Sequence, residues 1–362
     1  MDCLYLGRSD VDKICQVISR NRALNDHTLK LFLDPGITRL NLYDCSSKYV
    51  LYAKVRSYSN IAPEISTNEL RSIGVILPTL RYLTLRFCGS MTDEVLSYYA
   101  SQLTELKGIE LWGPFLVTKS YYKEFFEARG AQLEEVTITD TFRVDVDVIS
   151  SIVDNCPNLK ELRLRQIVKF DNEAVRLLTG LNNLKVLEIS DPGGDVQDGA
   201  IIDLLNSIGS GLRELNLSGC ILLTDETLLA IRKCCPRLLS LSLREAADIT
   251  DEGVAQLFSN WSINHGLQHI NLSRLRKLTC LGIEALLEHS RATVEVLNLN
   301  ACPLTPDAWD FWWKGGMKKL QCLDVGFIRS VDDSVVEKLC HEVCPNLGEL
   351  KVCSLFFHLC ES

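Results

Sequence analysis

The sequence predicts an α/β solenoid in which many short parallel strands form one sheet and helices cover its other side. Three observations lead to this prediction. A short apolar pattern, L-x-x-L-x-L, recurs along the chain, its recurrences are evenly spaced, and a helical pattern follows them. Because no unit of this size buries its own apolar side chains, neighbouring units are expected to stack and share one core.

The strand pattern begins at twelve positions, and from the second onward the steps are 25 to 29 residues long. The starting residues are 37, 80, 106, 133, 159, 184, 212, 238, 267, 294, 320 and 347. Such small changes in spacing are expected of surface loops. The period, the leucines and the recurrent cysteines are those of the longer leucine-rich repeat. They predict a horseshoe with its sheet on the concave face and its helices on the convex face.

The helices are marked at both ends. Residues 92–100, 224–238 and 250–258 each open with Thr-Asp, a favourable pair at a helix N-terminus. Cys-Pro follows such helices at 156–157, 235–236 and 344–345. Because proline cannot continue a helix, these pairs predict where helices end.

The chain has fifteen cysteines, and about half of them occupy fixed positions in the repeat. The turn after a strand holds Cys45, Cys88, Cys220 and Cys302, and the position before the proline holds Cys156, Cys235 and Cys344. The start of the chain shows no basic segment followed by an apolar run, as a signal peptide would. We therefore expect a reducing compartment in which the cysteines are small buried residues.

Two segments depart from the repeat. Residues 1–36 are predicted to form a helical N-terminal cap, because the stretch 10–35 reads as two short amphipathic helices. Residues 37–362 then form a solenoid of about 12 repeats. The step from 37 to 80 contains a polar insertion at 46–70, which we expect to be a loop. The alternative is a flap over one end of the concave face.

Composition and motifs argue against several functions. The net charge of −9 disfavours a protein that coats nucleic acid or anionic membranes by itself. No stretch approaches the roughly 18 apolar residues of a membrane span. The sequence contains no phosphate-binding loop, nucleophile elbow or zinc-protease motif. We expect neither an enzyme nor a cofactor.

Two residue clusters near the C-terminus are predicted to be structural. A zinc site built from residues 340–344, Cys353, His358 and Cys360 is the less favoured alternative, because Cys344 has a repeat position. Trp309 and Trp313 are four residues apart and are expected to face the core, with Trp312 exposed.

The concave strand face is the surface that is expected to bind a partner. The residues on either side of the second and third apolar positions of each repeat point outward from the sheet. They include Arg86, Trp112, Arg163, Arg165, Arg244, His269, Asn271, Asn298 and Asn300. The same face carries Glu110, Glu135, Glu161, Glu188 and Glu214. For each single residue the alternative is an ordinary solvated surface, but a broad polar arc with aromatic anchors favours protein recognition.

One resemblance is to the leucine-rich-repeat F-box proteins, whose arrays hold substrates for a cullin ubiquitin ligase. It rests on the pattern C-P-x-L-x-x-L-x-L followed by a turn cysteine and Thr-Asp. The pattern stands here at Cys235, Pro236, Leu238, Leu241 and Leu243, and at Cys220, Thr224 and Asp225.

Residues 14–45 resemble the segment that opens the repeats of the fungal leucine-rich-repeat subunit of global-genome nucleotide excision repair, and residues 156–178 are similar to that family too. This resemblance implies a non-enzymatic nuclear subunit. Its implied partners are a Swi/Snf-type ATPase with a RING finger, elongin C and a cullin, in a ubiquitin ligase that recognises damaged DNA. Given the negative net charge, we expect DNA to be bound through the partner. The alternative is a cytoplasmic substrate receptor of the F-box kind. Neither reading includes a membrane or a small-molecule substrate.

Overall fold

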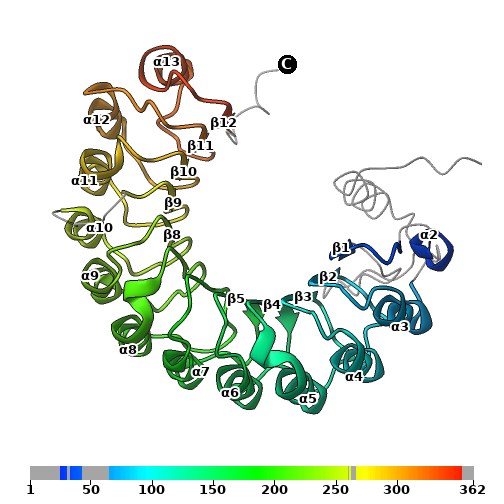
Figure 1. Ribbon diagram of the computed structural model, residues 1–362. Coiled ribbons are helices and arrows are strands. Elements are labelled where there is room, and N and C mark those ends of the chain that lie inside the picture. The colour runs from blue at the N-terminus through cyan, green and yellow to red at the C-terminus, as the bar shows by residue number, and fades with distance from the viewer. Residues whose placement is uncertain (1–24, 31–32, 43–64, 260, 262–265, 353–362) are drawn as a thin grey trace, which may run out of the picture. The chain divides into compact units, whose positions relative to one another are not determined.

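The computed structural model describes residues 25–30, 33–42, 65–259, 261 and 266–352. The chain forms two compact units, Met1–Lys169 and Phe170–Ser362. In each unit the strands form a parallel sheet in sequence order, and the helices lie on its other side (Figure 1). The predicted fold class, an α/β leucine-rich-repeat solenoid, is confirmed.

In the first unit each strand pairs with the next one along the chain. The strands are β1 (Arg39–Leu42), β2 (Tyr82–Arg86), β3 (Gly108–Trp112), β4 (Glu135–Thr141) and β5 (Glu161–Ile167). The described helices are α2 (Asp26–Lys30), α3 (Thr67–Ile76), α4 (Asp93–Gln102), α5 (Lys119–Arg129) and α6 (Val146–Asn155).

The second unit repeats the arrangement with shorter strands. They are β6 (Val186–Ser190), β7 (Glu214–Asn216), β8 (Ser240–Ser242), β9 (His269–Asn271), β10 (Val296–Asn298), β11 (Cys322–Asp324) and β12 (Glu349–Lys351). The helices are α7 (Asn172–Leu177), α8 (Asp198–Ile208), α9 (Asp225–Cys234), α10 (Asp251–Phe258), α11 (Cys280–Ser290), α12 (Asp310–Trp313) and α13 (Asp333–Lys338).

Every strand begins two residues after the opening apolar residue that the sequence assigned to it, as Glu214 follows Leu212. The alternation of side chains along a strand then separates core from surface. Leu215 and Leu217 are buried, whereas Asn216 between them lies on the opposite, strand face. The predicted assignment of inward and outward positions is therefore confirmed.

The Thr-Asp pairs begin helices as predicted, but the aspartate also links neighbouring repeats. Asp225, the first residue of α9, accepts hydrogen bonds from the backbone amide (2.8 Å) and the hydroxyl (2.6 Å) of Thr250 in the next repeat. The same contact runs from Asp93 to Thr118, from Asp198 to Thr224 and from Asp251 to Thr279. Each of these repeats thus helps to fix the helix N-terminus of its successor.

One glycine makes room for this linkage. A Cβ atom at Gly253 would lie 1.9 Å from the Asp225 Oδ1 atom, well inside the contact distance of real side chains. The amide of Gly253 also donates to the Thr250 hydroxyl at 3.1 Å. A residue with a side chain at position 253 would therefore displace the carboxylate that ties the two repeats together.

The repeat cysteines within the described residues are buried, as predicted, whereas Cys45 lies outside those residues. In the turns, the Cys220 and Cys302 thiols donate to the carbonyls of Ile189 and Leu272 in preceding repeats, at 3.5 and 3.1 Å. Burial raises the pKa of both thiols to about 12. The pre-proline residues Cys156, Cys235 and Cys344 are equally buried, and the pKa of each is raised to about 12 for the same reason. These five thiols fill the core as small apolar groups.

The tryptophan cluster corrects one prediction. Trp312, which was expected to be exposed, is fully buried, and Trp313 is the half-exposed residue. Pro306–Trp309 forms a 3₁₀ helix, and α12 begins directly after it at Asp310. Residues three apart, like residues four apart, are neighbours on a helix surface, and here Trp309 and Trp312 pack inward together with ring centroids 5.6 Å apart.

The two irregular segments of the first unit are described only in part. Leu29 of α2 is buried, in agreement with an apolar face there, but residues 1–24 of the predicted cap lie outside the described residues. The predicted insertion at 46–70 is described from Ile65 onward. Its last residues belong to α3, whose N-terminus is capped by the Ser66 hydroxyl. The bounds of cap and insertion stay predictions.

Candidate functional site

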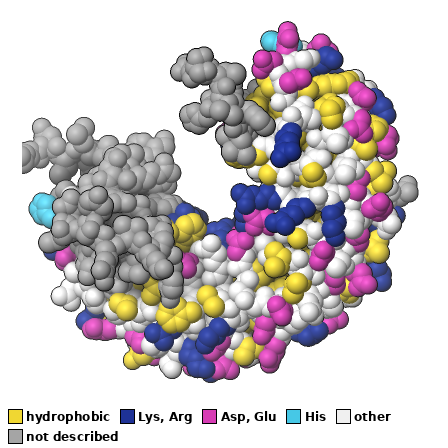
Figure 2. Space-filling view, turned by 180° about the vertical axis from the view of Figure 1, so that it is seen from behind, with side chains coloured by type: hydrophobic (Ala, Val, Ile, Leu, Met, Phe, Trp, Pro, Cys, Tyr) yellow, Lys and Arg dark blue, Asp and Glu magenta, His cyan; other side chains and the backbone are white. Residues whose placement is uncertain are grey.

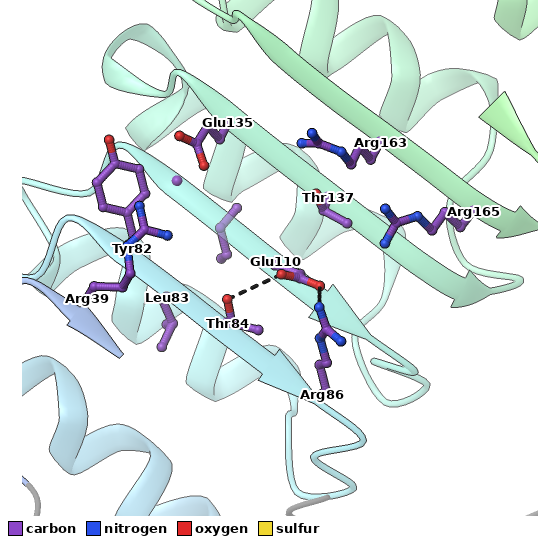
Figure 3. A pocket seen from close by; sticks show the side chains of 12 residues that line it. Arg39, Tyr82, Leu83, Thr84, Arg86, Glu110, Glu135, Thr137, Arg163 and Arg165 are labelled. Atoms are coloured by element: carbon purple, nitrogen blue, oxygen red, sulfur yellow. Dashed lines mark hydrogen bonds and ion pairs between the residues drawn. The ribbon is translucent and has the colours of Figure 1, made fainter. Parts of the chain in front are cut away.

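The strand face of the first unit carries four of the residues that the sequence singled out. Arg86 on β2 is in register with Trp112 on β3, and Arg165 on β5 is in register with Thr139 on β4. Arg163, two residues before Arg165, points to the same side of the sheet (Figure 3). Stacked parallel strands thus bring together side chains that are up to 79 residues apart in sequence.

These side chains surround a shallow hollow of about 240 Å³. Four arginines and two glutamates contribute to its lining together with smaller residues. The lining consists of Arg39, Tyr82, Leu83, Thr84, Arg86, Gly108, Ile109, Glu110, Glu135, Thr137, Arg163 and Arg165 (Figure 3). We call this the arginine hollow.

One end of the arginine hollow is built by stacking. The Arg39 guanidinium lies 3.9 Å from the centroid of the Tyr82 ring. The ring lies over Gly108, where a Cβ atom would be only 2.6 Å from Tyr82 Cδ1. Stacking occupies the flat face of a guanidinium and leaves its in-plane N–H groups as donors. Gly108 therefore lets Tyr82 lie flat, and Tyr82 in turn orients Arg39.

The other end is fixed by an ion pair. Arg86 Nη2 lies 2.7 Å from Glu110 Oε1, and its guanidinium stacks on Trp112 at 4.3 Å from the ring centroid. Thr84 donates to Glu110 Oε2 at 3.3 Å. The Glu110 carboxylate is thus occupied by neighbours on β2, so its negative charge is largely compensated in place.

Glu135 is the second acidic residue of the arginine hollow. It is in register with Glu161 on the neighbouring strand, and Glu161 is paired with Arg163 at 2.5 Å. Partial burial and, next, the Glu161 charge raise the pKa of Glu135, while Arg39 and Arg163 oppose that rise. Like charges on adjacent strands destabilise a sheet, so this face is not optimised for folding alone.

Sequence reasoning missed Arg39, Tyr82, Gly108 and Thr137 as parts of this site. Arg39 and Tyr82 occupy the same repeat position as Glu135, Glu161 and His269, two residues after the opening apolar residue. The signal for them was therefore present in the register, since both precede a buried leucine as Glu161 does. Gly108 carries no side chain to notice, and its role follows only from the contact with Tyr82.

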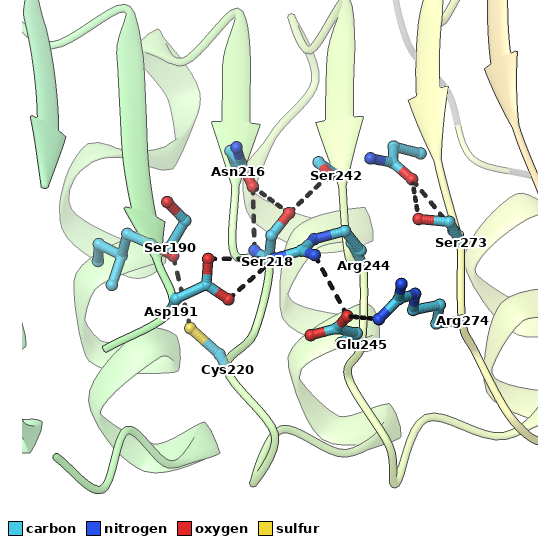
Figure 4. A network of polar contacts seen from close by, with 12 residues as sticks. Ser190, Asp191, Asn216, Ser218, Cys220, Ser242, Arg244, Glu245, Ser273 and Arg274 are labelled. Carbon is cyan, nitrogen blue, oxygen red and sulfur yellow. Dashed lines mark hydrogen bonds and ion pairs between the residues drawn. The ribbon is translucent and has the colours of Figure 1, made fainter. Parts of the chain in front are cut away.

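In the second unit, Arg244 belongs to a chain of ion pairs (Figure 4). Its Nη2 atom lies 2.9 and 3.1 Å from the two carboxylate oxygens of Asp191, and Nη1 lies 3.2 Å from Glu245. Glu245 also pairs with Arg274 at 2.7 Å. In Figure 2, dark blue and magenta side chains lie next to one another on the surface of the second unit. Arg244 therefore ties together loops from several repeats.

The Asp191–Arg244 pair spans the repeat that lies between its members. Gly219 occupies that intervening repeat with φ +73°, a conformation that side chains disfavour. A Cβ atom there would lie 2.2 Å from Asp191 Oδ1. Because Gly219 has no side chain, Asp191 and Arg244 can approach each other and form the ion pair.

The predicted asparagines of the second unit have local roles. Asn271 accepts a hydrogen bond from the Ser273 amide at 3.1 Å, and Asn298 accepts one from the Asn300 amide at 2.9 Å. Asn300 donates to Asp324 at 3.0 Å, whereas His269 is exposed at the entrance of β9. The first two thus hold the strand ends in shape, and their use by a partner stays a prediction.

The fold and this face define a class of protein: a leucine-rich-repeat protein whose strand face presents arginine, glutamate and aromatic side chains. No helix within the described ranges has the length and apolar character needed to cross a bilayer.

Comparison with known proteins narrows the class. No family model matches the chain. It is 42% identical over 333 residues to the DNA repair protein rhp7 of Schizosaccharomyces pombe, covering 91% of this chain and 56% of that protein. It is 34% identical over 358 residues to the DNA repair protein RAD7 of Saccharomyces cerevisiae, covering 96% of this chain and 59% of that protein.

A solved structure agrees with these relatives. The chain resembles Rad7 in the crystal structure of the yeast Rad7 and Elc1 complex, with a TM-score of 0.81 and 32% identity over 96% of this chain and 83% of that one. The chain therefore belongs to the family of leucine-rich-repeat DNA repair proteins that includes rhp7 and RAD7, as the resemblance implied. It spans less than three fifths of the length of those two relatives.

Proposed function

We propose that this protein is a non-catalytic interaction subunit of a DNA repair complex with ubiquitin-ligase activity, and that it works in the nucleus. The observation that carries the proposal is the likeness to Rad7 over 96% of the chain with a TM-score of 0.81. Its support in sequence is the identity of 34 to 42% to two DNA repair proteins.

The proposed partners follow from the same likeness. Rad7 was crystallised with Elc1, which favours a partner of the elongin C type for this chain. A cullin and a RING-bearing Swi/Snf-type ATPase complete the proposed assembly, as the sequence resemblance implies. Damaged DNA would be bound by the ATPase, since this chain carries a net charge of −9. The strand face, with its arginine hollow, would hold a protein segment.

Affinity purification of the tagged chain from nuclei, with mass spectrometry before and after ultraviolet irradiation, tests this function. The expected result is co-purification of an elongin C-type protein and the RING-bearing ATPase. The matched control is the Leu217→Asp variant, which should lose these partners because its repeats unfold. Recovery of an F-box-type assembly in place of the ATPase would favour the cytoplasmic substrate receptor instead.

A further inference from the structure

The arginine hollow continues into an aromatic surface. Arg86 stacks on Trp112, and Trp112 makes an edge-to-face contact with Phe87 at 5.5 Å between ring centroids. A Cβ atom on Gly113 would touch both Phe115, at 3.0 Å, and Phe87, at 3.7 Å, so these two rings flank the same glycine. Charged and apolar surfaces are therefore continuous along this side of the first unit.

Beyond Phe87, the loops after β3, β4 and β5 expose large apolar side chains in three consecutive repeats. Phe115 and Leu116 are 39% and 56% exposed, Phe142 is 42% exposed, and Val168 is 56% exposed. In Figure 2, hydrophobic side chains gather over this part of the first unit. We call these four residues the loop-edge patch. Apolar side chains that recur at one loop position in adjacent repeats mark an interaction surface.

Charge and size indicate what the arginine hollow accepts. Four arginines line the hollow, and two of them are in ion pairs, Arg86 with Glu110 and Arg163 with Glu161. With Glu135 as the third carboxylate on this face, one positive charge remains in excess, so an anionic group is favoured. A volume of about 240 Å³ leaves room for one side chain. Arg39, held flat by Tyr82, presents in-plane donors of the kind that bind carboxylates.

The neighbouring apolar surface favours protein over nucleic acid. A phosphate backbone would carry repeated charges past Glu135 and Glu161 and would leave the loop-edge patch uncovered. An extended peptide alternates its side chains and can place one acidic group in the hollow with apolar groups beside it.

We propose that the arginine hollow and the loop-edge patch together bind an extended segment of a partner protein in which an acidic residue is flanked by aromatic or aliphatic residues. This inference rests on the proposed interaction role and names the chemistry of the partner at that site. Arg39 binds the carboxylate, and Phe115 and Leu116 cover the apolar side chains. Glu135 sets a limit on the negative charge that the hollow accepts.

The first experiment is a selection of random twelve-residue peptides on the immobilised full chain at neutral pH. The expected result is enrichment of Asp or Glu next to Phe, Leu, Ile or Trp. Selected peptides are then labelled, and their binding is measured by fluorescence anisotropy. A selection that yields no binding peptide, or one that enriches basic sequences, overturns the proposal.

Variants locate the site. Arg39→Glu is expected to weaken binding of the selected peptides by about tenfold or more, because one charge-assisted hydrogen bond is lost and a repulsion is added. Leu116→Ser should weaken binding by about threefold or more through lost apolar contact. Glu135→Gln should strengthen binding. Arg276→Glu, an exposed residue of the second unit with the same charge change, is the matched control and should bind normally.

Two other ligands of this surface, single-stranded DNA and a second copy of the chain, would give different results. Tighter binding of a twelve-nucleotide single-stranded DNA with the same sensitivity to Arg39→Glu would assign the hollow to nucleic acid and overturn the proposal. Sedimentation that shows a dimer dissolved by Leu116→Ser would assign the patch to a second copy. These measurements use the isolated chain without other subunits. If no acidic peptide binds, the proposal about the arginine hollow fails, whereas membership of the repair complex is tested separately by the affinity purification.

Discussion

Asp225 accepts hydrogen bonds from both the amide and the hydroxyl of Thr250, a residue of the next repeat. The N-terminus of α10 is therefore completed by the repeat before it. Since neighbouring repeats supply each other's caps as well as each other's core, stability is shared between them.

Replacing Asp225 by alanine should lower the free energy of unfolding by about 1–3 kcal/mol, because two hydrogen bonds to a carboxylate are lost and a partly buried amide is left unpaired. Urea denaturation measures this. Asp248→Ala is the matched control: its carboxylate is more than half exposed and forms a surface ion pair with Lys277, so a change within about 0.5 kcal/mol is expected. Equal effects of the two variants would contradict the linking role of Asp225.

A charge in the shared core should unfold several repeats together. Leu217 is fully buried, so Leu217→Asp is expected to cost more than about 4 kcal/mol and to remove the cooperative thermal transition. Ile221, four residues later in the same repeat, is 57% exposed, and Ile221→Asp should leave the transition nearly unchanged. Circular dichroism during heating distinguishes the two. A folded Leu217→Asp variant would mean that the faces are assigned wrongly.

The two adjacent tryptophans should differ in their contributions. Trp312→Ala is expected to lose about 3–5 kcal/mol, because it empties a buried site next to Trp309. Trp313→Ala should lower the free energy of unfolding by about 1 kcal/mol or less, since that ring is partly exposed and its centroid lies 6.5 Å from that of Trp309. Urea midpoints of both variants test which ring faces the core, and the reverse order would mean that Trp313 is the buried residue.

Protonation of His289 should lower the free energy of unfolding as the solution becomes acidic. Its ring stacks on Trp261 and its Nε2 lies 3.0 Å from the Trp261 carbonyl oxygen, and burial lowers its pKa. The unfolded chain therefore binds the proton more readily, so stability present above pH ~6.5 is lost as the pH falls toward the depressed pKa. Urea midpoints between pH 5 and 8 should show this slope, and His289→Gln should flatten it. An unchanged slope in that variant would remove His289 as the cause.

The register of the sheet could be predicted because each repeat carries the same leucines at the same offset. Leu212, Leu215 and Leu217 fix one strand, and the next repeat copies the spacing. A one-residue slip would expose every leucine, so the pattern leaves a single solution. The same logic placed Arg86, Trp112 and Arg163 on the strand face without any knowledge of their contacts.

Contacts between repeats could not be predicted in the same way. The arginine hollow depends on Tyr82 lying flat on Gly108, and the contact joins residues 26 positions apart through a side chain that is missing. Trp312 was misplaced because residues three and four positions after Trp309 both neighbour it on a helix, and the sequence does not say which of them faces the core. Both cases depend on local packing that a period does not encode.

The buried cysteine thiols can report when the repeat that contains them separates from its neighbours. Cys220, Cys235 and Cys302 are uncharged at neutral pH and inaccessible, so alkylating reagents can modify them only when the surrounding repeat separates from its neighbours. Cys340, which is exposed, would react before these three thiols and provide an internal reference rate. The native chain thus carries, without any engineered label, a set of probes from which the order of fraying along the second unit can be read.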